Sequence, residues 1–293
     1  MTKSNSLSGA IYATAASISW GILPIYWKQL KSIPSMEVLC HRLLWSFLFY
    51  FFILLMRVRW QEIIKIATTP RYFAAFSASG LLIAVNWLLY ITAVNSGLVL
   101  QASLGYFLTP LMNVLFGLIF LKERLTKAGW VSVFLASLGI LVLATFNQQF
   151  PWFAILLALT FGTYGLIRKI MPLEVIAASA LESLVILPFA LFYLIYFGET
   201  TNVANIPNVI LILLVFSGVI TGLPLLWYAN AARRLNLSTL GFFQFIAPTL
   251  QFMLAVFLYN ETFTRIHAYG FLLIWSAIGI YLAGTWKRSS ARI

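Results

Sequence analysis

Four ionisable side chains lie within apolar runs of this 293-residue chain. Glu182 lies nine residues into the run 174–197, and Glu37, His41 and Arg42 lie in the first turns of an earlier run. A charge at the centre of a helix in lipid costs about 2.5–3.5 kcal/mol, so such positions point to function. Glu182 could bind a proton or a cationic group, or stay protonated in the protein wall. The other three could form a gate, a structural clamp or a charged helix end, because Glu37 and His41 are one turn apart.

Two proline-containing segments carry polar or small residues on one helical face. The first set is Ser103, Tyr106, Pro110 and Asn113, and the second is Gly241, Gln244, Pro248 and Gln251. Spacings of three and four residues place each set on one face of a helix. A mid-helix proline leaves the carbonyl four residues earlier without its donor. Such carbonyls and amides could bind a polar solute in a water-filled cavity, or the two faces could pack against neighbouring helices.

Aromatic and amide side chains elsewhere could complete the lining of such a cavity. These candidates are Trp20, Tyr26, Asn86, Trp87, Tyr90, Trp227, Tyr228 and Asn230. Other Trp and Tyr residues would anchor helices at the membrane surface. We expect no catalytic residue, metal site or cofactor, because Cys40 is the single cysteine, no Cys/His spacing suggests zinc, and no P-loop motif occurs.

The composition indicates a membrane protein. Hydrophobic residues make up 62% of the chain, charged residues 9%, and the mean hydropathy is +0.94, whereas soluble domains contain about 25% charged residues. One core in a chain of this length could not hide so much apolar surface, so lipid must solvate it. The net charge of +12 lies in short clusters between apolar runs, which argues against a nucleic-acid partner.

An all-α integral membrane protein with ten transmembrane helices is expected. A bilayer requires roughly 20 apolar residues per helix, and the first run reads as a span rather than a cleaved signal peptide. The expected spans are 7–27, 37–56, 72–95, 98–121, 128–146, 150–167, 174–197, 209–231, 238–259 and 268–286. Short connections leave no room for a soluble domain.

The distribution of Lys and Arg predicts the orientation of these spans. With both termini in the cytoplasm, fifteen basic residues lie on the cytoplasmic side, three lie opposite, and Arg42 lies within a span. The cytoplasmic set is Lys3, Arg57, Arg59, Lys65, Arg71, Lys122, Arg124, Lys127, Arg168, Lys169, Arg233, Arg234, Lys287, Arg288 and Arg292. Lys28, Lys31 and Arg265 form the opposite set.

An internal repeat divides the chain into halves of five spans, 7–146 and 150–286. Shifted by 138 residues, the segment 87–126 aligns without gaps on 225–264, and Glu123 meets Glu261. An odd number of spans per half makes the second half inverted, an architecture common in secondary transporters. The alternative is a duplicated membrane protein that transports nothing.

Two local features have structural explanations. Glu123 follows an apolar run in the sequence Lys-Glu-Arg, and we expect it to cap or pair at a helix end. Small residues at near-helical spacing in spans 5 and 10 permit close helix approach; they are Ser132, Ala136, Gly139, Gly279 and Ala283. Internal packing is favoured over a homodimer interface, and a monomer in the lipid bilayer is therefore expected.

Long motifs resemble the RarD branch of the EamA-type transporters, in the drug/metabolite transporter superfamily. They are WGILPIYWK (20–28), EVLCHRLLWS (37–46), the segment 86–125, YGLIRK (164–169), ALESLVILP (180–188) and the segment 231–261. The resemblance covers nearly the whole chain. It implies a ten-helix, two-repeat fold in the bacterial inner membrane and export of small metabolites or drugs, with chloramphenicol as a candidate.

Three functional classes follow from these patterns. A secondary transporter of a small-molecule substrate is expected. An intramembrane enzyme is the second class, although the chain has no H-E-x-x-H or G-x-S-x-G motif, and His41 and His267 lie near span ends. A non-transporting scaffold is the third, but it would not require polar faces beside prolines in both halves.

Overall fold

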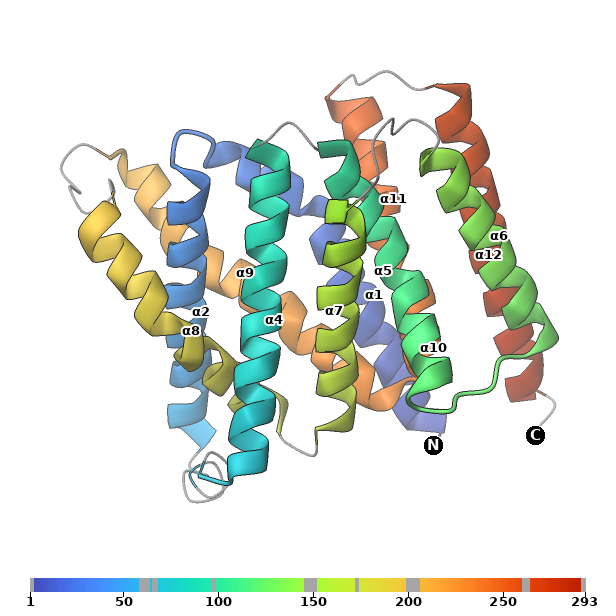
Figure 1. Cartoon of the computed structure of the whole chain (residues 1–293), viewed down its shortest axis with the longest axis horizontal. Coiled ribbons are helices and arrows are strands. Elements are labelled where there is room, and N and C mark those ends of the chain that lie inside the picture. Colours follow the sequence, from blue (N-terminus) through green and yellow to red (C-terminus); the bar gives the residue numbers. More distant parts are fainter. Residues whose placement is uncertain are drawn as a thin grey trace.

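The computed structural model is a bundle of helices packed side by side (Figure 1). It describes residues 3–57, 64, 68–95, 99–144, 152–171, 174–198, 206–259 and 264–290. In the first half the helices are α1 (Lys3–Gln29), α2 (Ser35–Arg57), α4 (Pro70–Asn95), α5 (Val99–Ile119) and α6 (Lys127–Ala144). In the second half they are α7 (Trp152–Ile170), α8 (Val175–Phe197), α9 (Asn208–Arg234), α10 (Leu237–Gln244), α11 (Ile246–Met253), the π-helical turn η3 (Leu254–Leu258) and α12 (Arg265–Ser290).

Every expected span falls on a helix or, for 238–259, on a run of short helices. Within the described ranges, eight helical segments are long and apolar enough to cross a membrane. Neither α1 nor α5 is among the eight, and in α5 the apolar segment Leu104–Ile119 is shorter than the others. The chain is therefore an all-helical protein with multiple membrane spans.

The ninth span departs from the prediction because it is broken. Helix α10 ends at Gln244 and α11 begins at Ile246, with Phe245 between them. Pro248 has no N–H to donate to the Gln244 carbonyl four residues earlier, which explains the break at this position. Pro110 leaves α5 continuous, so the two prolines affect their helices differently.

The helix contacts occur in matched sets that relate the two halves. Each helix of the first half has an equivalent in the second: α1 and α7, α2 and α8, α4 and α9, α5 and α10–α11, α6 and α12. When both helices of a main contact are replaced by their equivalents, the resulting pair is also in contact. Thus α1 packs on α9 as α7 packs on α4, and α2 packs on α9 as α8 packs on α4. Contacts α2–α8, α5–α10 and α6–α12 join equivalent helices. The start of α1 and the end of α12 lie at the same edge of the bundle (Figure 1).

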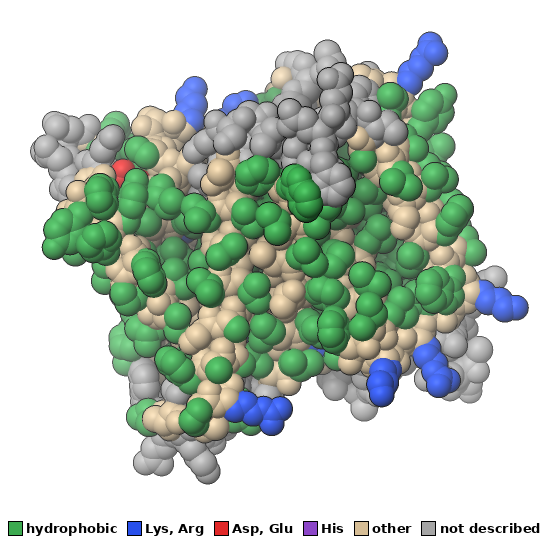
Figure 2. Space-filling model, viewed as in Figure 1, with side chains coloured by type: hydrophobic (Ala, Val, Ile, Leu, Met, Phe, Trp, Pro, Cys, Tyr) green, Lys and Arg blue, Asp and Glu red, His purple; other side chains and the backbone are tan. Residues whose placement is uncertain are grey.

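The flank of the bundle is apolar. Figure 2 shows hydrophobic side chains over most of this face, with Lys and Arg mostly near its upper and lower edges. Phe189 and Phe257 leave 76% and 79% of their surfaces exposed. Large apolar side chains this exposed are unfavourable in water and suit a lipid environment.

Glu123 caps a helix of the other half. Its carboxylate accepts hydrogen bonds from the backbone N–H of Leu237 at 2.7 Å, the N–H of Ser238 at 3.0 Å and the Ser238 hydroxyl at 2.7 Å. These groups begin α10, where the unpaired N–H groups favour an anion. The expectation that Glu123 caps a helix end is confirmed, whereas its repeat mate Glu261 lies outside the described residues.

Small residues allow close helix crossings inside the bundle. Ser132 and Ala136 are fully buried, and a Cβ on Gly139 would lie 2.8 Å from the Gly270 carbonyl of α12. Internal packing is therefore confirmed for α6. Gly279 differs from the prediction, because nothing lies within 4 Å of a Cβ placed there, and Ala283 is exposed.

Candidate functional site

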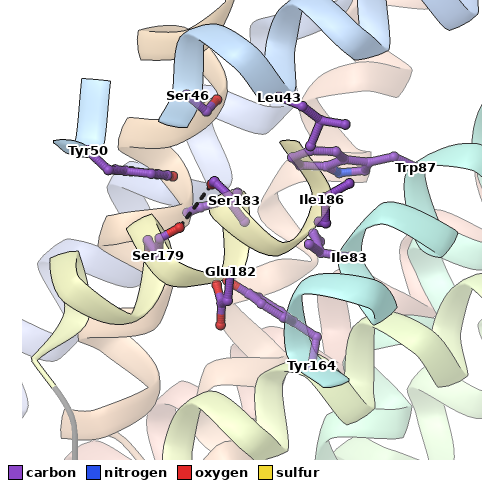
Figure 3. Close-up of a pocket in the computed structure, with 11 residues that line it drawn as sticks. Leu43, Ser46, Tyr50, Ile83, Trp87, Tyr164, Ser179, Glu182, Ser183 and Ile186 are labelled. Carbon is purple, nitrogen blue, oxygen red and sulfur yellow. Dashed lines mark hydrogen bonds between the residues drawn. The ribbon is translucent and has the colours of Figure 1, made fainter. Parts of the chain in front are cut away.

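A pocket with a mostly apolar lining and a few polar side chains lies in the bundle where the two halves meet. Its walls come from α2 and α4 of the first half and from α7, α8 and α9 of the second. The lining residues are Leu43, Ser46, Tyr50, Ile83, Trp87, Tyr164, Ser179, Glu182, Ser183, Ile186 and Leu225 (Figure 3). The space between its atoms measures about 350 Å³ when space open to solvent is included, but the pocket is narrow, with room for little more than one ordered water.

A buried ion pair forms one end of this pocket. Arg168 Nη1 donates to Glu182 Oε1 at 3.0 Å, while Nη2 donates to the Val175 carbonyl and the Ser179 hydroxyl, both at 3.1 Å. The Ser79 hydroxyl of α4 also donates to Glu182 Oε1. These bonds satisfy both charges, as buried ions require. Glu182 is therefore paired with Arg168 here rather than isolated in the wall.

Arg168 is a buried charge near the end of α7. Its position at the end of an apolar run predicted a charge on the cytoplasmic side; the residue is 3% exposed, so it is enclosed by protein, and its side of the membrane stays a prediction. It lies two residues before the end of α7, and its side chain reaches inward to α8. Its neighbour Lys169 donates to the carbonyls of Ala232 and Leu235 and so caps the end of α9.

A second arginine, Arg42, lies among aromatic rings that include Trp87. The Arg42 guanidinium carbon lies 4.4 Å from the ring centroid of Trp27 and 4.5 Å from that of Trp87. Its Nε donates to Thr221 Oγ1 at 3.1 Å. Each stacked ring stabilises the cation by roughly 0.5–2 kcal/mol. Because Trp87 also lines the pocket, the Arg42 site adjoins the space that contains Glu182.

The expected group of Glu37, His41 and Arg42 is divided by the structure. Glu37 is 1% exposed and lies beside Gly198 at the end of α8, where an added Cβ would meet Oε1 at 3.2 Å. His41 is half-buried on the same helix. Arg42 instead contacts α1, α4 and α9 through Trp27, Trp87 and Thr221.

The two proline-containing faces pack against each other. The Asn113 amide donates to Gln244 Oε1, and a Cβ on Gly241 would lie 2.5 Å from the Pro110 carbonyl. Asn113 is 0% exposed and Gln244 is 6% exposed. Of the two interpretations of these faces, packing holds in this structure, and neither side chain lines the pocket. Their role in a substrate path stays a prediction.

The other residues of these faces differ in their surroundings. Pro248 is buried, and Gln251 donates to the Trp20 carbonyl at 3.0 Å. Tyr106 leaves 37% of its surface exposed and contacts Tyr90 edge to face, with 5.5 Å between ring centroids. The Ser103 side chain lies outside the described residues.

The remaining candidates are mostly held by neighbouring helices. Asn86 donates to the Leu157 carbonyl at 2.9 Å and to Thr160 Oγ1 at 2.8 Å, and the Tyr26 hydroxyl donates to the Leu213 carbonyl. The ring contacts of Tyr228 include Trp20, Phe161 and Tyr164. Trp227 packs at the edge of the same core, and Asn230 binds the Leu226 carbonyl and Arg234. Among all the candidates, Glu182 and Trp87 line the pocket.

A second internal alignment in the sequence points to pocket residues that were not predicted. Shifted by 137 residues, EVLCHRLLWS (37–46) aligns on EVIAASALES (174–183), so Trp45 corresponds to Glu182 and Arg42 to Ser179. The structure supports this correspondence at two tight crossings. A Cβ on Gly80 of α4 would lie 2.8 Å from the Glu182 carbonyl, and one on Gly218 of α9 would lie 2.2 Å from the Trp45 carbonyl carbon.

Each half therefore has one arginine at an equivalent contact between helices, here called an arginine joint. The segment WGILPIYWK (20–28) aligns on FGTYGLIRK (161–169) with a shift of 141 residues, which pairs Trp27 with Arg168. The contact of Trp27 with Arg42 therefore corresponds to the contact of Arg168 with Ser179. In the second half Glu182 neutralises the arginine. In the first half the position of Glu182 is occupied by Trp45, which cannot neutralise Arg42.

The sequence pattern of the EamA-like transporter family matches residues 7–145 and again residues 151–284. The chain belongs to the EamA-like transporter family. Its relatives confirm the resemblance to the RarD branch. Protein RarD of Escherichia coli (strain K12) is 40% identical over 286 residues, which cover 96% of each chain.

Other relatives extend this comparison over nearly the full length. An uncharacterized transporter of Vibrio cholerae serotype O1 is 42% identical over 275 residues, covering 93% of this chain and 91% of that one. The chloramphenicol-sensitive protein RarD of Pseudomonas aeruginosa is 28% identical over 274 residues, covering 92% of each. This EamA family member is therefore a membrane transporter.

A solved crystal structure resembles the fold. Its TM-score is 0.74, and the alignment covers 94% of this chain and 97% of the other. The sequences are 16% identical, so the likeness concerns the arrangement of helices alone.

Proposed function

We propose that the protein is a secondary transporter that exports small metabolites or drugs through the pocket between its halves. The observation that carries this proposal is the position of the pocket, whose walls combine helices of both halves around a buried ion pair. Substrate sites of inverted-repeat transporters lie at such an interface. No ATP-binding P-loop occurs in the sequence, which favours secondary transport.

The membrane topology belongs to the same proposal. Ten spans form two inverted repeats, 7–146 and 150–286, with both termini in the cytoplasm of a bacterium and the bundle in its inner membrane. The matched helix contacts support the repeats, the excess of Lys and Arg on one side supports the orientation, and the bacterial relatives support the location.

Glu182 is our candidate for energy coupling. Protonation of this carboxylate would remove the negative charge that pairs with Arg168, whose Nη1 donates to Oε1 in the present structure. Protonation would therefore free a buried arginine and favour a rearrangement of α7 against α8, which is a means of linking proton binding to conformation. With Glu182→Gln, we expect flux to lose its pH dependence; unchanged pH dependence contradicts this role.

Flux into proteoliposomes tests transport directly. The panel contains amino acids, nucleosides and amphenicols, and chloramphenicol is included because a 28% identical relative is named as chloramphenicol-sensitive. We expect uptake of at least one substrate class above that of protein-free liposomes. If the folded protein moves none of them, the alternatives of an intramembrane enzyme or a scaffold gain support.

A further inference from the structure

We propose that Arg42 is the binding site for the carboxylate of an organic anion and that the surrounding aromatic rings hold its apolar body. This inference rests on the proposed function and specifies the substrate class. It comes from the comparison of the two arginine joints. Arg168 is bound to Glu182, Ser179 and a carbonyl, whereas Arg42 has Thr221 and two rings.

The described glutamates are all engaged elsewhere. Glu123 caps α10, Glu174 caps α8, Glu182 binds Arg168, and Glu37 lies beside Gly198. Among the residues that the structure describes, no ion pair to Arg42 occurs. A guanidinium has five N–H donors and stays charged, and only its Nε has a described hydrogen-bond acceptor. The terminal nitrogens have the fork geometry that binds a carboxylate with two hydrogen bonds.

The surroundings of Arg42 fit a ligand with a planar apolar body. Trp27 and Trp87 stack on the guanidinium, and Tyr26, Tyr90 and Tyr106 lie in its neighbourhood. Arg42, Trp27, Trp87 and Tyr90 are half-buried rather than closed off, and Tyr106 is 37% exposed. Aromatic walls with one fixed charge are typical of sites for small organic ions.

The Arg42 site also connects to the pocket. Trp87 contacts Arg42 and also lines the pocket together with Glu182. An anion released from Arg42 would therefore pass Trp87 and meet the ion pair of Arg168 and Glu182. Such an order of sites attracts the ligand at one charge and avoids permanent capture, because the second arginine is already neutralised.

The test measures binding rather than flux, with the full chain in nanodiscs. The probes are three aryl carboxylates, indole-3-acetate, phenylacetate and benzoate, each compared with its neutral amide by isothermal calorimetry. We expect at least one acid to bind at least tenfold more tightly than its amide. Equal binding of acid and amide, or no binding of any acid, would overturn the proposal without any mutation.

Variants then locate the site. Arg42→Gln should weaken binding of the preferred acid at least tenfold and leave the amide unchanged, and Arg42→Lys should lose less because it keeps the charge. Arg71→Gln, at an exposed arginine at the start of α4, is the matched control and should bind as the wild type does. Wild-type affinity in Arg42→Gln would overturn the assignment of Arg42.

The two proposals can fail separately. If the acid binds through Arg42 but no substrate crosses proteoliposomes, the transport proposal fails and the binding site stands. If neutral substrates cross and no acid is preferred over its amide, transport stands and the anion site fails.

Discussion

Removal of Glu182 or of Arg168 from their ion pair should destabilise the protein by different amounts. In Glu182→Gln the arginine keeps its charge, since a guanidinium is not deprotonated in proteins, and it retains the acceptors Val175 and Ser179. Removing one partner of a buried pair costs about 3–5 kcal/mol. The two remaining acceptors place the expected loss near the lower limit, at about 3 kcal/mol.

The reverse substitution should cost less. In Arg168→Gln, Glu182 can take up a proton and remain hydrogen-bonded to Ser79. The loss is then mainly that of the arginine's hydrogen bonds, without the penalty of leaving a buried charge unpaired. The double variant removes both charges. Its loss of stability should be smaller than the sum of the two single losses by at least about 1 kcal/mol.

Thermal unfolding of the purified protein in one detergent, followed by tryptophan fluorescence, measures these differences. About 3 kcal/mol corresponds to a fall in Tm of about 6–12 °C for a protein of roughly this size. Glu174→Gln is the matched control, because this exposed carboxylate on the same helix caps α8 through Ala177 and its loss should cost well under 1 kcal/mol. Equal shifts for Glu182→Gln and Glu174→Gln, or strict additivity in the double variant, would refute the reasoning.

Further substitutions test three other contacts. Gly218→Ala should destabilise the protein by about 1–3 kcal/mol, because its Cβ would lie 2.2 Å from the backbone of α2, whereas Gly279→Ala, with nothing within 4 Å, should leave Tm unchanged or slightly higher. Glu123→Ala should cost about 1–2 kcal/mol, because three hydrogen bonds to α10 are lost; an unchanged Tm contradicts the cap. Leucine at both Asn113 and Gln244 should be tolerated better than leucine at either alone, and a stable double variant without transport would restore the cavity interpretation.

The helices could be predicted from the sequence because apolar length and polar interruptions determine them locally. The expected span 174–197 coincides within one residue with Val175–Phe197, and 209–231 lies within Asn208–Arg234. The break at Phe245 was not predicted, although Pro248 removes a hydrogen-bond donor at a known distance. Pro110 shows the limit of this rule, since the same residue type leaves α5 continuous.

The site was harder to predict because it depends on contacts between distant helices. Arg168 is at the end of an apolar run, where a basic residue ordinarily marks the membrane surface. Its burial depends on Glu182, Ser179 and Ser79 converging from two other helices, and residue spacing within one helix does not contain that information. In contrast, the polar face of Asn113 was correctly placed on one side of its helix, but only the packing of α10 shows what covers it.

The difference between the two arginine joints leads to a last prediction, at Trp45. This residue corresponds to Glu182 by alignment and lies three residues after Arg42 on α2, so a glutamate there can reach the guanidinium along the helix surface. Trp45→Glu should therefore give Arg42 an internal counter-ion and weaken binding of the preferred acid at least tenfold. Trp45→Gln removes the same ring without adding a charge and should bind the acid more tightly than Trp45→Glu does. Equal affinities in the two variants, measured by calorimetry in nanodiscs, would show that Arg42 does not act as a free cation toward the ligand.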